Sequence, residues 1–213
     1  MLILIDKYAK YRIMRNIAIL ASGSGTNAEN IIKYFSNTNT AQVSLVLSNK
    51  RQAMVLKRAE AHKIRTVFFE HKEFYVTGKV LRYLALYKID FIVLAGFLWL
   101  VPENIIEQFP GRIINIHPAL LPAYGGKGMY GDAVHKAVIA NHDDESGITI
   151  HYVNKQYDKG DTILQVRCKV DPNETPDSLA SKVHALEYLH YPEVIEELVV
   201  KLPDFLIKGP EEA

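Results

Sequence analysis

Cysteine is nearly absent from this chain of 213 residues, in which Cys168 stands alone. A single cysteine cannot close an internal disulfide, and it rules out zinc sites built from several cysteines. The 8 histidines show no ligand spacing such as His-x-x-x-His. The sequence therefore predicts no disulfide framework and no metal, and a reducing, cytoplasmic location fits it best.

A strong excess of either charge is missing as well. The chain has 25 Lys and Arg against 24 Asp and Glu, which gives a formal net charge of +1. Nucleic-acid binding usually needs a concentrated basic surface, so no nucleic-acid partner is expected.

Long apolar runs are also lacking. The segment Met1-Leu-Ile-Leu-Ile-Asp6 has too few apolar residues for the core of a signal peptide, and far too few for a membrane span. No membrane partner is expected. Residues 1–13 are interpreted as a disordered extension, and the folded domain is expected to begin at Met14.

What remains is the composition of an ordinary globular protein, long enough for one α/β domain. Short apolar runs alternate with stretches of helical periodicity, which predicts a mostly parallel, twisted sheet with helices on both faces. The expected strands are residues 17–20, 43–47, 66–69, 91–94 and a run that ends at His117. The expected helices are residues 28–35, 53–61, 72–87 and 102–108.

The pattern changes after His117. Residues 148–153 and 162–170 are predicted to form a C-terminal antiparallel β-hairpin extension of the sheet, joined through the turn 157–161. A helix is expected from Pro176, interrupted at Tyr191 because Pro192 cannot continue the hydrogen-bond ladder. Residues 202–213 are interpreted as a tail.

Asn115 and His117 close the apolar run that starts at Arg112. Residues i and i+2 of a strand share a face, so the two side chains can converge on one small volume at the strand's carboxyl end. Pro118 then ends the strand. A carboxamide and an imidazole at such a place suit an oxyanion site for acyl transfer. The alternative is that both side chains only cap the strand and its loop.

A glycine-rich loop, residues 21–27, links the first strand to the first helix. Glycines let main-chain N–H groups approach a phosphate at a helix start. The pattern Gly23-x-Gly25-x-x-Ala28 also fits a dinucleotide fingerprint, but Ser48-Asn49 stands where that motif needs an acidic residue. A single phosphate is therefore preferred. The alternative is a tight turn with Thr26 or Asn27 as the helix cap.

The run Asn115-Ile-His-Pro118, followed by Ala119-Leu-Leu-Pro122, resembles the signature of folate-dependent formyltransferases. Within them the chain is most similar to the glycinamide ribonucleotide formyltransferases of purine biosynthesis. The resemblance implies a formyl donor, 10-formyltetrahydrofolate, and an acceptor, the amine of 5′-phosphoribosylglycinamide. It also implies one Rossmann-like formyltransferase domain over residues 14–213, with a phosphate-binding half (14–114) and a catalytic and folate-binding half (115–200), as a monomer or homodimer.

The resemblance also implies roles for single residues. Asn115, His117 and Asp158 correspond to the catalytic residues, with His117 held protonated by Asp158. From the residues alone Asp161 competes with Asp158, and either is an ordinary turn aspartate; the family motif before Ile163-Leu-Gln165 selects Asp158. The ribonucleotide phosphate is assigned to Gly25, Thr26 and Asn27. Its ribose or amine is assigned to Glu187, which by itself fits a solvated helical face shared with His184.

For the folate, the resemblance implies a pterin pocket along the backbone of Leu98, Trp99, Leu100 and Val101, completed by Asn115 and His135. Trp99 departs from the basic or aliphatic residues expected there. By itself His135 fits a solvated histidine at a helix start. The family arginine expected near residues 71–75 is replaced by His71, Lys72 and Glu73. The glycine-dense stretch 123–131 is expected to be a mobile lid.

Three other functions remain open at this point. Methionyl-tRNA formyltransferase shares the signature, but it needs a further tRNA-binding domain and a basic surface. Formyltetrahydrofolate hydrolase has a similar catalytic core, usually with an extra N-terminal regulatory domain, and uses water as acceptor. A nucleotide-binding regulatory module would keep the loop 23–27 without chemistry, and the joint presence of Asn115, His117 and Asp158 argues against it.

Overall fold

The computed structural model describes residues 14–203. The predicted extension 1–13 and residues 204–213 of the predicted tail lie outside the described residues. Within the described range, no helix has the length and apolar character needed to cross a membrane.

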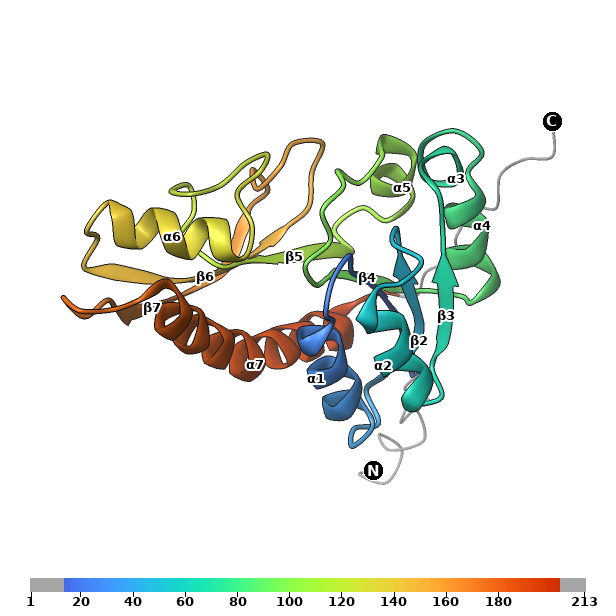
Figure 1. The fold of residues 1–213 in the computed structure, drawn as a ribbon. Coiled ribbons are helices and arrows are strands. Elements are labelled where there is room, and N and C mark those ends of the chain that lie inside the picture. Colours follow the sequence, from blue (N-terminus) through green and yellow to red (C-terminus); the bar gives the residue numbers. More distant parts are fainter. Residues whose placement is uncertain (1–13, 204–213) are drawn as a thin grey trace, which may run out of the picture.

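The described chain forms one seven-stranded sheet with the order β3-β2-β1-β4-β5-β6-β7. β1 to β5 run parallel, which confirms the predicted mostly parallel α/β sheet. β6 is antiparallel to both β5 and β7. In Figure 1, β6 and β7 extend the sheet beyond its parallel part. The strands are β1 (Arg15–Leu20), β2 (Ala41–Ser48), β3 (Arg65–Phe68), β4 (Phe91–Leu94), β5 (Ile113–His117), β6 (Glu145–Tyr152) and β7 (Thr162–Lys169).

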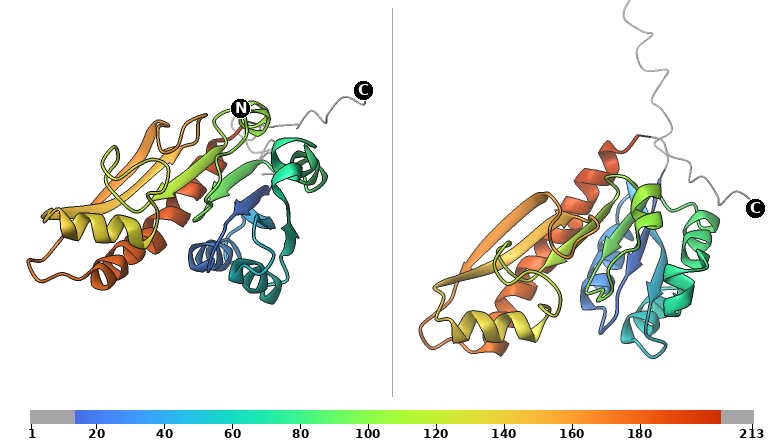
Figure 2. Two further views of the ribbon diagram at one scale, coloured as in Figure 1. Left: turned by 45° about the horizontal axis from the view of Figure 1, so that its top comes forward. Right: turned by 90° about the horizontal axis from the view of Figure 1, so that it is seen from above.

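Helices cover both faces of the sheet, as predicted (Figure 2). α1, α2 and α7 pack on one face, α3, α4 and α5 on the other, and α6 packs against α7. The helices are α1 (Thr26–Phe35), α2 (Met54–Ala61), α3 (His71–Tyr75), α4 (Lys79–Leu86), α5 (Glu103–Gln108), α6 (Asp132–Ala140) and α7 (Pro176–Lys201).

The predicted helix 72–87 is two helices, α3 and α4. Gly78 adopts φ 62 at the start of α4, a left-handed conformation that interrupts a right-handed helix. The prediction of one continuous helix across Gly78 was therefore wrong.

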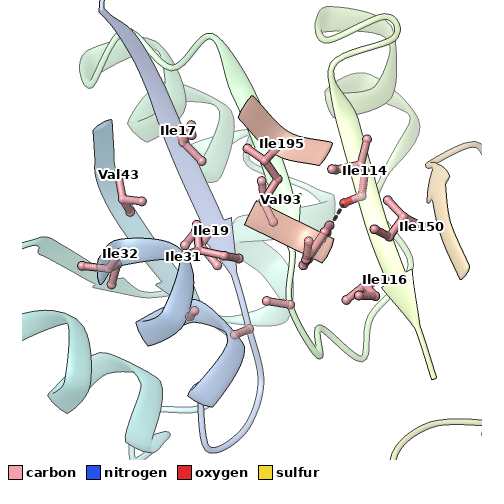
Figure 3. Packing of buried hydrophobic residues seen from close by; sticks show 14 of the residues in the cluster. Ile17, Ile19, Ile31, Ile32, Val43, Val93, Ile114, Ile116, Ile150 and Ile195 are labelled. Atoms are coloured by element: carbon pink, nitrogen blue, oxygen red, sulfur yellow. Dashed lines mark hydrogen bonds between the residues drawn. The ribbon is translucent and has the colours of Figure 1, made fainter. Parts of the chain in front are cut away.

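Each face of the sheet carries its own apolar cluster, because the central strands are apolar on both sides. In β4, Phe91 and Val93 belong to the cluster under α1 and α7, while Ile92 and Leu94 belong to the cluster under α4 and α5. Figure 3 shows members of the first cluster, among them Ile195 of α7. Burial on both faces explains the uniformly apolar strands of the sequence.

Helix α7 runs unbroken from Pro176 to Lys201, so the predicted interruption at Tyr191 was wrong. Pro192 has no N–H to donate to the carbonyl of Tyr188, four residues earlier. The side chain of Asn30, on α1, fills that place: its Nδ2 donates to the Tyr188 carbonyl oxygen at 2.8 Å. The neighbouring Tyr191 is fully buried, and its hydroxyl donates to the carbonyl of Leu94 at 2.9 Å. Tertiary contacts thus hold the proline inside the helix.

The strand order reverses between β1 and β4, since the chain builds outward from β1 in one direction and from β4 in the other. Loops that leave two such strands at their carboxyl ends diverge and leave a crevice between them. The loop after Leu20 and the loop after Leu94 lie at this point. The topology therefore places both predicted binding loops at one crevice.

Replacing Asn30 with Ala should leave the Tyr188 carbonyl without a donor and lower the free energy of unfolding by about 1–2 kcal/mol. In a Pro192→Ala background the restored N–H can donate to Tyr188, so the same Asn30→Ala change should cost less. Urea denaturation of the wild type, the two single variants and the double variant measures both values. Asn37→Ala, an exposed change just after α1, serves as control. Equal losses in the two backgrounds would contradict this account of the proline.

Candidate active site

A cavity of about 570 Å³ opens at the carboxyl ends of β1, β4 and β5. Its size suits a small-molecule ligand. Every residue that the sequence assigned to catalysis or binding lines this cavity: Gly25, Thr26, Asn27, Leu98, Trp99, Leu100, Val101, Asn115, His117, His135, Asp158 and Glu187.

The loop after β1 presents the start of α1 to the cavity. Gly25 adopts φ 76, and a Cβ there would lie 2.5 Å from Cβ of Val55 on α2, so this position requires glycine. Gly25 is also the N-cap of α1, and no side chain caps the helix. The interpretation of Thr26 or Asn27 as the cap was therefore wrong. The uncapped N–H groups and the helix dipole make this loop suited to an anion.

Asn27 and Glu187 join the start of α1 to α7. Nδ2 of Asn27 donates to Oε2 of Glu187 at 2.9 Å. Burial raises the pKa of Glu187 to about 7, and the hydrogen bond from Asn27 only partly offsets this rise. Glu187 is 6 % exposed, so the solvated helical face considered for it was wrong. Within the described chain Oδ1 of Asn27 is buried and has no hydrogen-bond partner, which favours a polar ligand beside it.

His135 of α6 is buried, in contrast to the solvated histidine that its position alone suggests. Its ring lies 6.4 Å from the ring of His184 on α7, centroid to centroid. Burial lowers the pKa of His135, and His184 lowers it further. Both ring nitrogens of His135 lack a hydrogen-bond partner among the described residues. His135 thus lies against α7, the helix that also carries Glu187.

Asn115 lies directly opposite His151 in the antiparallel pair of β5 and β6. Nδ1 of His151 donates to the carbonyl of Tyr152 at 2.8 Å, so in the neutral ring Nε2 is left as an acceptor. Nδ2 of Asn115 lies 3.2 Å from that Nε2. Sequence reasoning missed His151, because only the pairing of β6 with β5 brings it here.

Asp158 projects into the cavity from the turn after β6, where it adopts φ 52. Its Oδ2 accepts from the Gly126 N–H at 2.9 Å and lies 3.7 Å from Nδ1 of His117. Its Oδ1 accepts from Nδ2 of Asn115 at 3.4 Å. Burial alone would raise the pKa of Asp158, but His151 and His117 in their protonated forms, together with the Gly126 N–H, lower it overall. The rival Asp161 is exposed and lies outside the cavity lining.

His117 is 3 % exposed, and its Nε2 donates to the carbonyl of Tyr124 at 2.7 Å. Burial lowers the pKa of His117, and Asp158 and the Tyr124 carbonyl offset this only in part. Burial thus works against the expected protonation of His117, which Asp158 favours. The resulting site combines an amide donor, a neutral imidazole and an ionised carboxylate.

The opposite wall is the loop after β4. The Leu98 N–H donates to Oγ of Ser22 at 3.0 Å, and the carbonyl of Leu100 accepts from the Tyr75 hydroxyl at 2.7 Å. Trp99 lies among aromatic rings, 5.4 Å from His71 and 6.1 Å from Tyr75 between centroids. This loop is thus fixed between β1 and α3 and offers the cavity a partly aromatic surface.

In residues 71–75, where the resemblance leads one to expect an arginine, the side chain of Glu73 makes local contacts. Glu73 caps α3 by accepting from the N–H of Glu70 at 2.9 Å, and it forms an ion pair with Lys79 at 2.5 Å. In residues 14–203 no group of three or more His, Cys, Asp or Glu is arranged to hold a metal ion.

Comparison with known proteins gives a consistent family. The sequence model of the formyl transferase family matches residues 15–195. A phosphoribosylglycinamide formyltransferase of Bacillus subtilis is 35% identical over 191 residues, which are 87% of this chain and 95% of that protein. The chloroplastic enzyme of the same name from Arabidopsis thaliana is 38% identical over 187 residues. That match covers 85% of this chain but only 64% of the Arabidopsis protein.

Solved structures agree. The crystal structure of phosphoribosylglycinamide formyltransferase from Bacillus halodurans has a TM-score of 0.79 at 32% identity, covering 91% of this chain and 100% of that one. The enzyme of the same name from Coxiella burnetii, solved in complex with CHES, has a TM-score of 0.79 at 35% identity, covering 87% of each chain.

The pKa of His117 tests the electrostatics of the site. It should lie below the usual 6.5 for histidine, because burial disfavours the charged ring. Removing the negative charge in Asp158→Asn should lower it further, since that carboxylate favours the imidazolium. Asp161→Asn, in the same turn but exposed, should leave it unchanged. NMR titration of the histidine ring protons measures all three, and a rise in Asp158→Asn would refute the assignment.

Proposed function

This chain belongs to the formyl transferase family, within it to the phosphoribosylglycinamide formyltransferases, and we propose that it transfers a formyl group to 5′-phosphoribosylglycinamide. The donor is 10-formyltetrahydrofolate, and the products are the N-formyl ribonucleotide and tetrahydrofolate, in purine biosynthesis. The observation that carries the proposal is the meeting of Asn115, His117 and Asp158 with a phosphate-type loop in one cavity. The single-cysteine composition supports a cytoplasmic enzyme.

The ribonucleotide is proposed to bind between α1 and α7. Its phosphate would accept from the uncapped N–H groups at Gly25, Thr26 and Asn27. Its ribose hydroxyls or amine would meet Glu187. The buried nitrogens of His135, which lack partners in the described chain and lie beside α7, support a further contact on this side rather than on the folate side alone.

The folate is proposed to lie along the loop after β4. A pterin ring is flat and rich in N–H and C=O groups, so main-chain N–H and C=O groups can form hydrogen bonds with its edge. The N–H of Leu98 and the carbonyl of Leu100 are already engaged by Ser22 and Tyr75. We therefore assign the pterin contacts to the main chain of Trp99 and Val101, together with the Leu98 carbonyl and the Leu100 N–H, with Asn115 at the formyl end.

In the reaction, the amine nitrogen bonds to the formyl carbon and negative charge develops on the former formyl oxygen. Asn115 is proposed to donate to that oxygen. Its present bonds to His151 and Asp158, at 3.2 and 3.4 Å, are long and can be exchanged for a better acceptor. Donors aimed at such charge in a water-poor site are typically the largest contribution to catalysis.

Proton transfer is proposed to run through Asp158 and His117. Asp158 is ionised and takes the proton that the attacking amine must lose. Nδ1 of His117, 3.7 Å from Oδ2 of Asp158, is the next acceptor, and the resulting imidazolium stabilises the oxyanion by its charge. The proton then passes to the folate nitrogen as the carbon–nitrogen bond breaks. One proton therefore moves from the amine to the leaving group, and none is consumed.

The first test mixes the protein with 10-formyltetrahydrofolate, with and without 5′-phosphoribosylglycinamide. Loss of the formyl group should require the amine, with formylated product appearing in step. Turnover without the amine would indicate the hydrolase. An absence of turnover in both mixtures would refute the proposal and leave a tRNA formyltransferase or a binding module.

In the same assay, Asn115→Ala should lower kcat by about 10²–10³, the effect of losing one oxyanion donor. Asp158→Asn should lower it by about 10²–10⁴, the range for a lost proton transfer. Asn37→Ala and Asp161→Asn, exposed and outside the cavity lining, are the matched controls. Near wild-type turnover in Asn115→Ala or Asp158→Asn would remove that residue from the mechanism.

Glu187 predicts a pH dependence of ribonucleotide binding. Because its pKa is raised to about 7, the carboxyl becomes ionised, and a better acceptor, only as pH rises through neutrality. Between pH 6 and pH 8 the KM for the ribonucleotide should therefore fall. In Glu187→Gln only ionisation of the substrate phosphate can still lower KM over this pH range, so the fall in KM should be smaller. At pH 8 the KM of Glu187→Gln should be about tenfold higher than that of the wild type. Glu193→Gln, exposed on the same helix, is the control, and an identical pH profile in Glu187→Gln would contradict the role.

A further inference from the structure

Main-chain groups of the loop after β5 contact both His117 and Asp158. The carbonyl of Tyr124 accepts from Nε2 of His117 at 2.7 Å, and the Gly126 N–H donates to Asp158 at 2.9 Å. A carbonyl oxygen can only accept, so the hydrogen of the neutral His117 ring is on Nε2. Nδ1 then carries the lone pair and faces Asp158. This loop therefore determines which nitrogen of His117 is free to take up a proton.

The backbone of this loop is held in an unfavourable conformation. Tyr124 adopts φ 55, in the left-handed region that residues with a Cβ rarely occupy. The next residue, Gly125, is packed so closely that a Cβ would lie 2.6 Å from Cδ2 of Leu121. Such a conformation persists only where its surroundings hold it in place.

The side chain of Tyr124 supplies that support. Its hydroxyl donates to Oδ2 of Asp143 and accepts from Nδ2 of Asn141 at 2.7 Å. Asn141 is the C-cap of α6. The bond to the Asp143 carboxylate is charge-assisted, and such bonds are stronger than neutral ones. Tyr124 is thus bonded to the end of α6 through its hydroxyl and to His117 through its carbonyl.

We propose that Tyr124 is a positioning residue: its anchored side chain holds its own carbonyl against Nε2 of His117 and keeps Nδ1 directed at Asp158. This rests on the proposed function, in which Nδ1 takes the proton from Asp158. Tyr124 is not among the residues that line the cavity, so it acts through His117 and not on the substrate. Nearly the whole effect of losing the anchor should therefore fall on kcat.

Two variants remove the anchor from opposite ends. Tyr124→Phe deletes the hydroxyl and keeps the ring, and Asp143→Ala deletes the acceptor without touching the loop. Each should lower kcat about tenfold, because small misplacements of a catalytic group are costly, with both KM values within about twofold of wild type. The double variant should be no slower than the slower single one, since both changes break one interaction. Asp144→Ala removes the exposed neighbouring carboxylate and is the matched control.

A second measurement separates positioning from plain structural support. ¹⁵N-labelled imidazole spectra report which ring nitrogen carries the hydrogen. His117 should appear as the Nε2–H tautomer in the wild type and in Asp144→Ala. In Tyr124→Phe and Asp143→Ala it should become a mixture of both tautomers. Thermal melting shows whether either variant is grossly destabilised.

Wild-type kcat in Tyr124→Phe would overturn the proposal. So would a lower kcat with an unchanged His117 tautomer, because Tyr124 would then only stabilise the fold. Failure of the proposed function is a distinct result: the wild-type protein itself would transfer no formyl group, while the spectra would still report whether Tyr124 sets the tautomer.

Discussion

The antiparallel pairing of β6 with β5 is the constraint on which the site depends. It places His151 opposite Asn115 and Thr149 opposite His117. The turn that follows β6 then returns over the end of β5, which carries Asp158 to the two catalytic candidates. The same pairing sets Tyr152, the last residue of β6, opposite Ile114 near the start of β5, so the following turn must fold back along β5 for Asp158 to reach His117. The register of this pair therefore determines which side chains meet Asn115 and His117.

Burial then sets the charge state of each group, and the groups diverge because their partners differ. Glu187 has one amide donor, so burial dominates and its pKa rises to about 7. Asp158 is also buried, but several donors surround it and its pKa falls. His117 loses its charge to burial despite the neighbouring carboxylate. Carboxyl groups kept in different states within one cavity are typical of enzyme sites.

The sequence predicts those parts of the site that rest on local geometry. Asn115 and His117 share a face because they are two residues apart on a strand, and Gly25 is recognisable because only glycine suits that turn. His151 and Tyr124 act through contacts between segments distant in sequence, so no local pattern marks them. The pKa of His117 is set in a related way: the motif reveals the neighbouring acid but not the depth of burial, which lowers that pKa.

Pro192 shows how far such long-range contacts extend. Asn27, Asn30 and Tyr34 recur at helical spacing along one side of α1, and each contacts α7. Asn27 bonds Glu187, Asn30 bonds the carbonyl that Pro192 leaves free, and Tyr34 bonds Glu196. The helix whose first turn is proposed to hold the phosphate thus also fixes the helix that carries Glu187. Because these bonds join α1 to α7, the two helices that would form the proposed ribonucleotide site hold each other in place.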